Sequence, residues 1–244
     1  MSKTMITAAV LSALTLSTTL AQSQQSAAAA AVKRAQVTSP KPSKQVDRNA
    51  QLTDAASINE DLIGFALDGE AGKVAEQVAA MRKSLPKLRS FLDTAVFETL
   101  GRQVTGMEQA SSQNDTLGAA LVAVESYRVI ETAMDTGSRP SPIEVAMLDY
   151  SGFKLSVLAA MQDTDWMTIT ATAREADTSW LALTTSVKDA SIRNLVSAIQ
   201  VGLRAAVERT DIQGVKFAAK MQLEVVDVLE GYFQRNPVSG GNRH

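Results

Sequence analysis

The sequence predicts an all-α protein of eight antiparallel helices, arranged as four helical hairpins. Three observations predict this fold. Apolar residues recur every three or four positions from residue 54 onward, and the sustained alternation typical of strands is absent. The apolar residues are mostly Ala, Val and Leu, which suit close helix packing better than sheets. Turn signals recur at nearly constant intervals along the chain.

The first 21 residues have the pattern of a secretory signal peptide. Lys3 precedes the apolar stretch Ile6–Leu16, and Thr19 and Ala21 place small residues at the −3 and −1 positions of a cleavage site. A membrane anchor is the alternative, but a span needs about 20 mainly apolar residues and this run is shorter. We expect cleavage near Ala21 and a periplasmic or secreted protein, with no stable membrane insertion after cleavage.

Residues 22–53 are expected to form a disordered basic linker. This segment contains the alanine run Ala27–Ala31 and two prolines, Pro40 and Pro42, and it shows no periodic apolar face. The last residues, 236–244, are expected to form a disordered tail. The folded part should therefore extend from residue 54 to residue 235.

The apolar spacing predicts the individual helices. They are expected at approximately 55–67, 70–92, 95–111, 116–136, 142–162, 165–187, 190–209 and 212–234. The clearest apolar face runs from Trp166 to Val187 in steps of three and four residues. Capping boxes are expected at Ser57, Ser141 and Thr210. Pro86 should kink or split the second helix because proline lacks the backbone N–H.

The helical part of the sequence shows the pattern of an internal repeat. The turn signals Asp68-Gly69, Asn114-Asp115, Asp163-Thr164 and Thr210-Asp211 lie 46, 49 and 47 residues apart. Shifting residues 68–110 by 95 positions superimposes apolar residues on apolar residues. We therefore predict two related up-down four-helix bundles, residues 54–137 and 141–235. An α-solenoid of helical hairpins is the alternative, because its repeats have a similar length.

The composition excludes several classes of catalytic and metal-binding site. The only histidine is His244, and the chain contains no cysteine. Di-iron sites, covalently bound haem, histidine-ligated zinc, serine–histidine triads and cysteine nucleophiles all need residues that are absent. We therefore predict no catalytic residue, no cofactor and no metal site, and hence a protein that is not an enzyme. A net charge of −2 and an aromatic content of 5% give no indication of nucleic-acid binding.

Two short motifs resemble those of cell-wall enzymes. Ser84-Leu85-Pro86-Lys87 and Ser151-Gly152-Phe153-Lys154 match S-x-x-K, without the other elements of penicillin-interacting enzymes. Glu125-Ser126-Tyr127 resembles the glutamate–serine start of lytic transglycosylases, which use a single general acid. The Gly-Leu-Met-Gln stretch that follows in that family is missing here.

Large amphipathic side chains could line a ligand groove between the two halves. The candidates are Tyr127, Glu125, Tyr150, Trp166 and Trp180. The favoured hypothesis is an exported, non-catalytic scaffold of the bacterial cell envelope that binds a partner protein or its own copies. The alternatives are a periplasmic carrier of a small ligand or divalent cation, and a lytic-transglycosylase-like cell-wall hydrolase.

Overall fold

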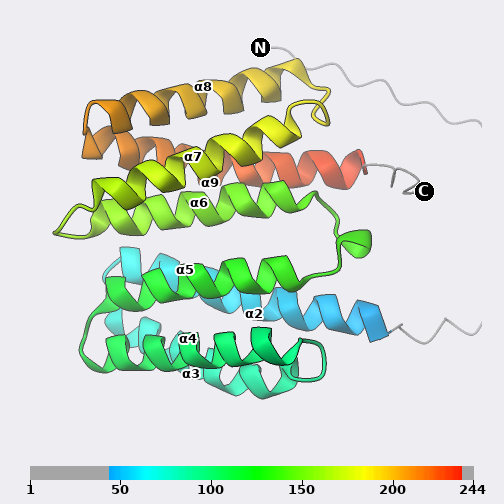
Figure 1. The fold of residues 1–244 in the computed structure, drawn as a ribbon, viewed down its shortest axis with the longest axis vertical. Helices are drawn as coiled ribbons and strands as arrows, with labels where there is room; N and C mark the ends of the chain where they lie inside the picture. Colours follow the sequence, from blue (N-terminus) through cyan, green and yellow to red (C-terminus); the bar gives the residue numbers. More distant parts are fainter. Residues whose placement is uncertain (1–43, 238–244) are drawn as a thin grey trace, which may run out of the picture. The chain divides into compact units, whose positions relative to one another are not determined.

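A computed structural model describes residues 44–237 of the chain, without the side chains of 44–47 and 138. Within that range the protein is all-helical, with eight α-helices, one short 3₁₀ helix and no strand (Figure 1). This confirms the predicted fold class. The elements are α2 (Lys44–Leu67), α3 (Ala71–Leu88), α4 (Thr94–Ser112), α5 (Thr116–Ala133), η1 (Thr136–Ser138), α6 (Ile143–Ala160), α7 (Trp166–Leu183), α8 (Ala190–Glu208) and α9 (Ile212–Arg235).

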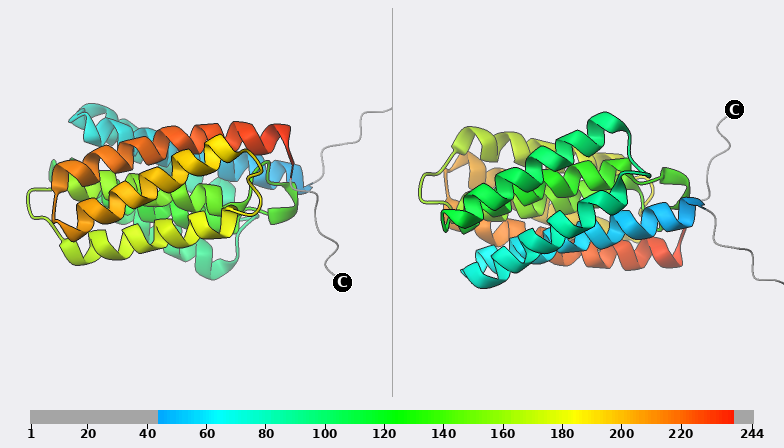
Figure 2. Two further views of the ribbon diagram at one scale, coloured as in Figure 1. Left: turned by 90° about the horizontal axis from the view of Figure 1, so that it is seen from above. Right: turned by 90° about the horizontal axis from the view of Figure 1, so that it is seen from below.

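The helices pack as two four-helix groups. In the first group α2 contacts α3 and α5, and α4 contacts α3 and α5; in the second group α6 contacts α7 and α9, and α8 contacts α7 and α9. Each group is therefore closed by contacts between its first and last helices, as in a bundle. We call them the first bundle (α2–α5) and the second bundle (α6–α9). Figure 2 shows the second bundle from one side and the first from the other.

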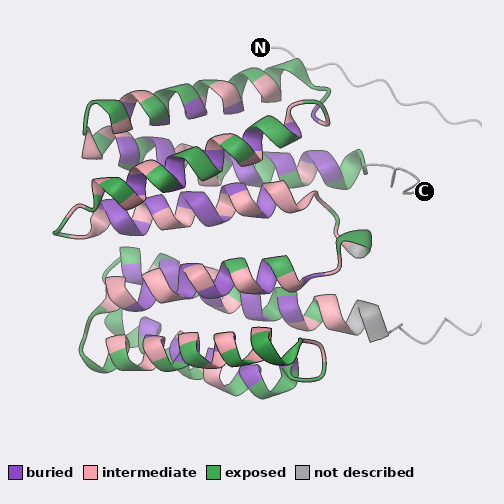
Figure 3. Cartoon of the chain, in the orientation of Figure 1, coloured by how far each residue is buried: buried purple, intermediate pink, exposed green. Residues whose placement is uncertain are grey.

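Each bundle has its own hydrophobic core (Figure 3). Most of the face from Trp166 to Val187 is buried as predicted, and Ile169 and Val187 are fully buried. The two cores meet mainly where α5 packs against α6, with a smaller contribution from α2 against α6. Tyr150 and Val157 of α6 belong to the core of the first bundle, so α6 links the two cores.

Helix α2 begins at Lys44, eleven residues before the expected start at residue 55. The prediction that residues 22–53 form a linker is therefore wrong for 44–53. Sequence periodicity missed this stretch because it is mainly polar, whereas distant contacts hold it in place. Arg48 donates to the carbonyl oxygen of Ala133 at 2.7 Å, and Leu52 is fully buried. The predicted signal peptide, the rest of the linker and residues 238–244 lie outside the described residues.

Aspartates cap four of the helices. Side chains of Asp115, Asp165, Asp189 and Asp211 accept backbone N–H groups at the starts of α5, α7, α8 and α9. The predicted capping boxes are wrong. Ser57 lies inside α2, Pro142 is the N-cap of α6 without a side-chain bond, and Thr210 precedes the true cap of α9.

The predicted turns lie between helices as expected. Gly69, Asn114 and Thr210 take positive φ angles of 75°, 57° and 49° where the chain reverses. Pro86 lies within α3, which continues only as far as Leu88 instead of residue 92. None of the helices in residues 44–237 combines the length and hydropathy that a membrane crossing requires.

Candidate functional site

A polar cluster joins α5 to α6 on one side of the contact between the bundles. Glu125 of α5 accepts hydrogen bonds from the hydroxyl of Tyr150 at 2.9 Å and from Lys154 Nζ at 2.7 Å. The Arg128 guanidinium pairs with the second carboxylate oxygen of Glu125 at 2.8 Å and lies over the Tyr150 ring. Every group in this cluster thus has a partner of complementary charge or polarity.

This cluster determines the protonation of Glu125. Burial alone would raise the pKa of its carboxyl, but hydrogen bonds from Lys154 and Tyr150, with the charges of Lys154 and Arg128, hold that pKa below its ordinary value. A general acid for glycoside hydrolysis needs a raised pKa. The geometry therefore gives no support to Glu125 as a lone catalytic acid.

A second polar group lies on the other side of α6. The Tyr127 hydroxyl donates to Asp149 Oδ2 at 2.8 Å. A cleft of about 270 Å³ opens between α2, α6 and α9 and contains Glu60, Asp149 and Glu230. Its lining has five carboxylates and no basic residue; the full set is Glu60, Asp149, Phe153, Leu223, Glu224, Val226, Asp227 and Glu230. We call it the acidic cleft.

Burial and mutual repulsion raise the pKa values of these acids. The pKa of Glu60 rises to about 7, chiefly through burial and then through the charges of Glu131 and Glu230. Burial also raises the pKa of Asp149 well above its ordinary value, against the hydrogen bond from Tyr127. Within the described residues no three acidic or metal-binding side chains are close enough to hold an ion. The carrier hypothesis in its divalent-cation form therefore gains no support from this cleft.

Glu131, at the end of α5, forms the most buried ion pair among those the structure records. Arg139 approaches its carboxylate at 2.6 Å, and both side chains are at most one-tenth exposed. Burial raises the pKa of Glu131, and the charge of Arg139 opposes that rise. The pair fastens the segment between η1 and α6 to the first bundle.

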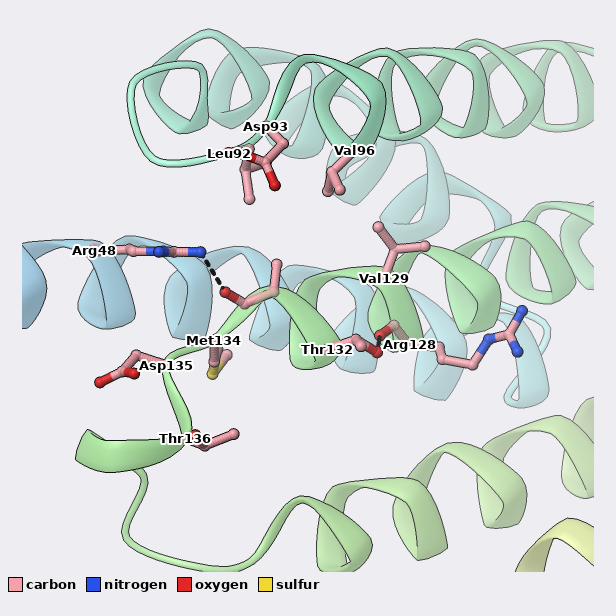
Figure 4. A pocket seen from close by; sticks show the side chains of 11 residues that line it. Arg48, Leu92, Asp93, Val96, Arg128, Val129, Thr132, Met134, Asp135 and Thr136 are labelled. Atoms are coloured by element: carbon pink, nitrogen blue, oxygen red, sulfur yellow. Dashed lines mark hydrogen bonds between the residues drawn. The ribbon is translucent and has the colours of Figure 1, made fainter. Parts of the chain in front are cut away.

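A large open cavity lies in the first bundle. It has a volume of about 610 Å³ and lies between α2, the α3–α4 connection and the end of α5 (Figure 4). Its lining is Arg48, Leu92, Asp93, Val96, Arg128, Val129, Thr132, Ala133, Met134, Asp135 and Thr136. The α5 end of this wall is fixed to α2, because the Asn49 amide accepts the Asp135 N–H at 3.1 Å.

The five predicted groove residues do not share one groove. Glu125 and Tyr150 are hydrogen-bonded, and Tyr150 lines a separate hollow of about 360 Å³ between α5, α6 and α7. Tyr127 instead bonds to Asp149. Trp180 is buried in the second bundle and donates to Ser197 at 3.1 Å, while Trp166 packs against the same core.

Sequence reasoning missed Arg48, which lines the 610 Å³ cavity, and Asp149, which lines the acidic cleft. Arg48 lies in the segment expected to be a linker, and Asp149 lies on α6, whose buried residues occur on all sides of the helix and mark no single polar face. The Ser151-x-x-Lys154 motif does not form a serine–lysine pair. Ser151 donates to Leu148 O at 2.9 Å, and Lys154 is bonded to Glu125 and Tyr150.

Comparisons with known proteins give no family. No protein-family profile matches the sequence, and neither the curated proteins nor the solved structures include a significant match.

Proposed function

We propose that this chain is an exported, non-catalytic helical scaffold of the bacterial cell envelope, and that it binds a partner protein or its own copies through the second bundle. The observation that carries this proposal is the distribution of exposed apolar side chains. Of the seven large hydrophobic residues exposed in the described part of the chain, only Leu67 belongs to the first bundle. The other six lie on α7, α8 and α9: Met167, Leu181, Leu195, Val201, Phe217 and Val228.

On α7, and likewise on α9, the exposed apolar residues lie along a single face of the helix. Met167 and Leu181 are four helical turns apart on α7, and Phe217 and Val228 are three turns apart on α9. The hydrogen bond from Gln200 to Gln222, at 2.9 Å, sets the register between α8 and α9 and places Leu195 level with Val228. Exposed apolar side chains on three helices of one bundle support contact with another protein surface.

Export is supported by the N-terminal sequence alone. Lys3, the apolar stretch Ile6–Leu16 and Ala21 have the order of a signal peptide. Mass spectrometry of the protein recovered from the periplasm should show a new N-terminus at Gln22. Recovery of the full-length chain from the cytoplasm would contradict export.

The binding role is tested by charge substitution. The doubly substituted Val201→Lys, Phe217→Lys chain should lose a crosslinked complex that the wild-type chain forms in the native envelope. Leu67→Lys is the matched control, because Leu67 is also an exposed apolar residue but lies on the first bundle. Light scattering of the purified chain separates the two kinds of partner, since self-association gives a dimer or larger species. A complex that survives the double substitution would overturn the proposal.

A further inference from the structure

The 610 Å³ cavity of the first bundle has the size of a small-molecule site. Leu92 and Val129 form part of its wall, and both pack against the hydrophobic core behind them. In Figure 4, Leu92, Asp93 and Val96 extend from the α3–α4 side toward Val129 on α5, while Arg48 enters from α2. The cavity thus has apolar walls on two sides and a charged group at its margin.

Two opposite charges line this cavity without pairing. Arg48 makes one hydrogen bond within the described residues, from Nη2 to Ala133 O, and its Nε has no acceptor. Asp93 occupies the N-cap position of α4, but its side chain accepts no capping hydrogen bond. Neither residue belongs to an ion pair that the structure records among residues 44–237. The Arg48 guanidinium, whose Nη1 makes no hydrogen bond among the described residues, and the Asp93 carboxylate therefore line the same hollow.

The balance of charge narrows the class of ligand. The lining has two basic residues, Arg48 and Arg128, and two acidic residues, Asp93 and Asp135. Arg128 is already paired with Glu125. A simple anion would be repelled by the two aspartates, and a simple cation would be repelled by Arg48. A molecule that carries both charges avoids either conflict, and its apolar part can lie against Leu92, Val96 and Val129.

We propose that this cavity binds a small zwitterion with an apolar side chain, an apolar amino acid or short apolar peptide, whose carboxylate contacts Arg48 and whose ammonium group contacts Asp93. Arginine favours carboxylates because its planar guanidinium can offer two parallel N–H donors. The site lies on the first bundle and does not depend on the apolar surface of the second.

Calorimetry on the full chain tests the ligand class with four compounds. L-leucine and the dipeptide leucyl-leucine carry both charges, isocaproate lacks the ammonium group and isopentylamine lacks the carboxylate. We expect saturable binding of at least one zwitterion, and binding about tenfold weaker or more for both single-charge analogues, the usual effect of losing one charge-assisted hydrogen bond. No saturable binding of either zwitterion at 10 mM, roughly the weak limit for specific small ligands, would overturn the proposal. Equal binding of isocaproate would overturn the role of Asp93, and with it the zwitterion.

Two variants test whether the ligand binds in this cavity. Asp93→Asn should weaken zwitterion binding about tenfold or more, and it should leave the fold intact because the Asp93 side chain makes no capping bond. Val96→Trp should abolish binding by filling the cavity. Asp163→Asn, an exposed acid in the α6–α7 loop, is the matched control and should bind as the wild type does. Circular dichroism confirms that each variant is folded, and unchanged affinity in folded Asp93→Asn protein would contradict the assignment.

Discussion

The two bundles repeat one arrangement of helix contacts, yet they present different surfaces and different interiors. The first bundle holds the 610 Å³ cavity and, within the described residues, exposes one large apolar residue, Leu67. The second bundle exposes six such residues and packs its core around a hydrogen-bonded pair of buried amides, Gln200 and Gln222. One topology therefore supports two kinds of surface, because the packed positions determine the fold and the outer positions are free to differ.

The largest expected effect comes from the buried amides. Gln222 is fully buried, donates to Leu148 O at 2.6 Å and Ser151 Oγ at 2.9 Å, and accepts from Gln200. Gln222→Leu leaves these groups without partners and should lower the free energy of unfolding by about 3 kcal/mol. Urea denaturation measures this.

The first bundle supplies the contrast. Asn59 is also fully buried, but its Oδ1 has no partner and its Nδ2 donates to Ala55 O in its own helix. Asn59→Leu should therefore change the free energy of unfolding by less than about 1 kcal/mol, or raise it. Equal losses of unfolding free energy for Gln222→Leu and Asn59→Leu would show that the two cores do not differ in this way.

The acidic cleft should make stability depend on pH. The pKa of Glu60 rises from 4.5 to about 7 in the folded chain, so the folded state holds a proton that the unfolded state releases. The stabilisation is complete below pH 4.5 and is lost as the pH rises through 7. Glu60→Gln should be more stable than the wild type above pH 7 by roughly 2 kcal/mol, after allowance for solvent screening.

Thermal unfolding between pH 4 and pH 8 checks this dependence. The two chains should differ little below pH 4.5 and diverge as the pH approaches 7. Glu76→Gln, on the exposed face of α3 in the same bundle, should track the wild type throughout. A constant difference between Glu60→Gln and the wild type across the range would show that the carboxyl does not titrate as described.

Glycines test how closely the helices approach. A Cβ added at Gly152 of α6 would lie 2.8 Å from Leu223 Cδ2 and 3.0 Å from Leu223 Cγ of α9, whereas one added at Gly106 of α4 would meet Val122 at 3.6 Å. Gly152→Ala should destabilise the chain by about 2 kcal/mol. Gly106→Ala should stabilise it by about 1 kcal/mol, because alanine favours helix. Stabilisation by both substitutions would mean that α6 and α9 are further apart.

A smaller effect than those of Gln222→Leu and Gly152→Ala is expected at a helix cap. Asp211 accepts the N–H groups of Gln213 and Gly214 at 3.1 and 3.0 Å. Asp211→Ala should lower the free energy of unfolding by about 1 kcal/mol. Thr210→Ala should not reproduce that loss through capping, since Thr210 bonds no backbone N–H of α9. Denaturant titration of both variants distinguishes the true cap from the predicted one.

Apolar spacing predicted the helices well because burial in a bundle follows the helical period. Ile169, Ala176 and Leu183 lie on the face that the sequence predicted, and all three are buried. Val228 of α9 is equally apolar but is 43% exposed. Periodicity gives the faces of a helix, but it does not tell how many of those faces a neighbour covers.

The candidate sites were much less predictable. Arg48 reaches a carbonyl 85 residues away in the sequence, and nothing local to its polar segment indicates that contact. Tyr127 and Asp149 are paired because α5 packs against α6 in one particular register. The prediction that Tyr127, Tyr150 and the two tryptophans line one groove grouped these residues by side-chain type. Their helices direct them to different interfaces, so they do not meet in one groove.

The central claim is that the second bundle, and not the first, carries the surface that binds a protein partner. Photo-crosslinking residues placed at Val201 and Phe217, and at the exposed positions Glu76 and Gln109 of the first bundle, test it directly in the native envelope. We predict several-fold higher yields of a discrete adduct from positions 201 and 217. Equal yields from the two bundles, or higher yields from positions 76 and 109, would contradict it.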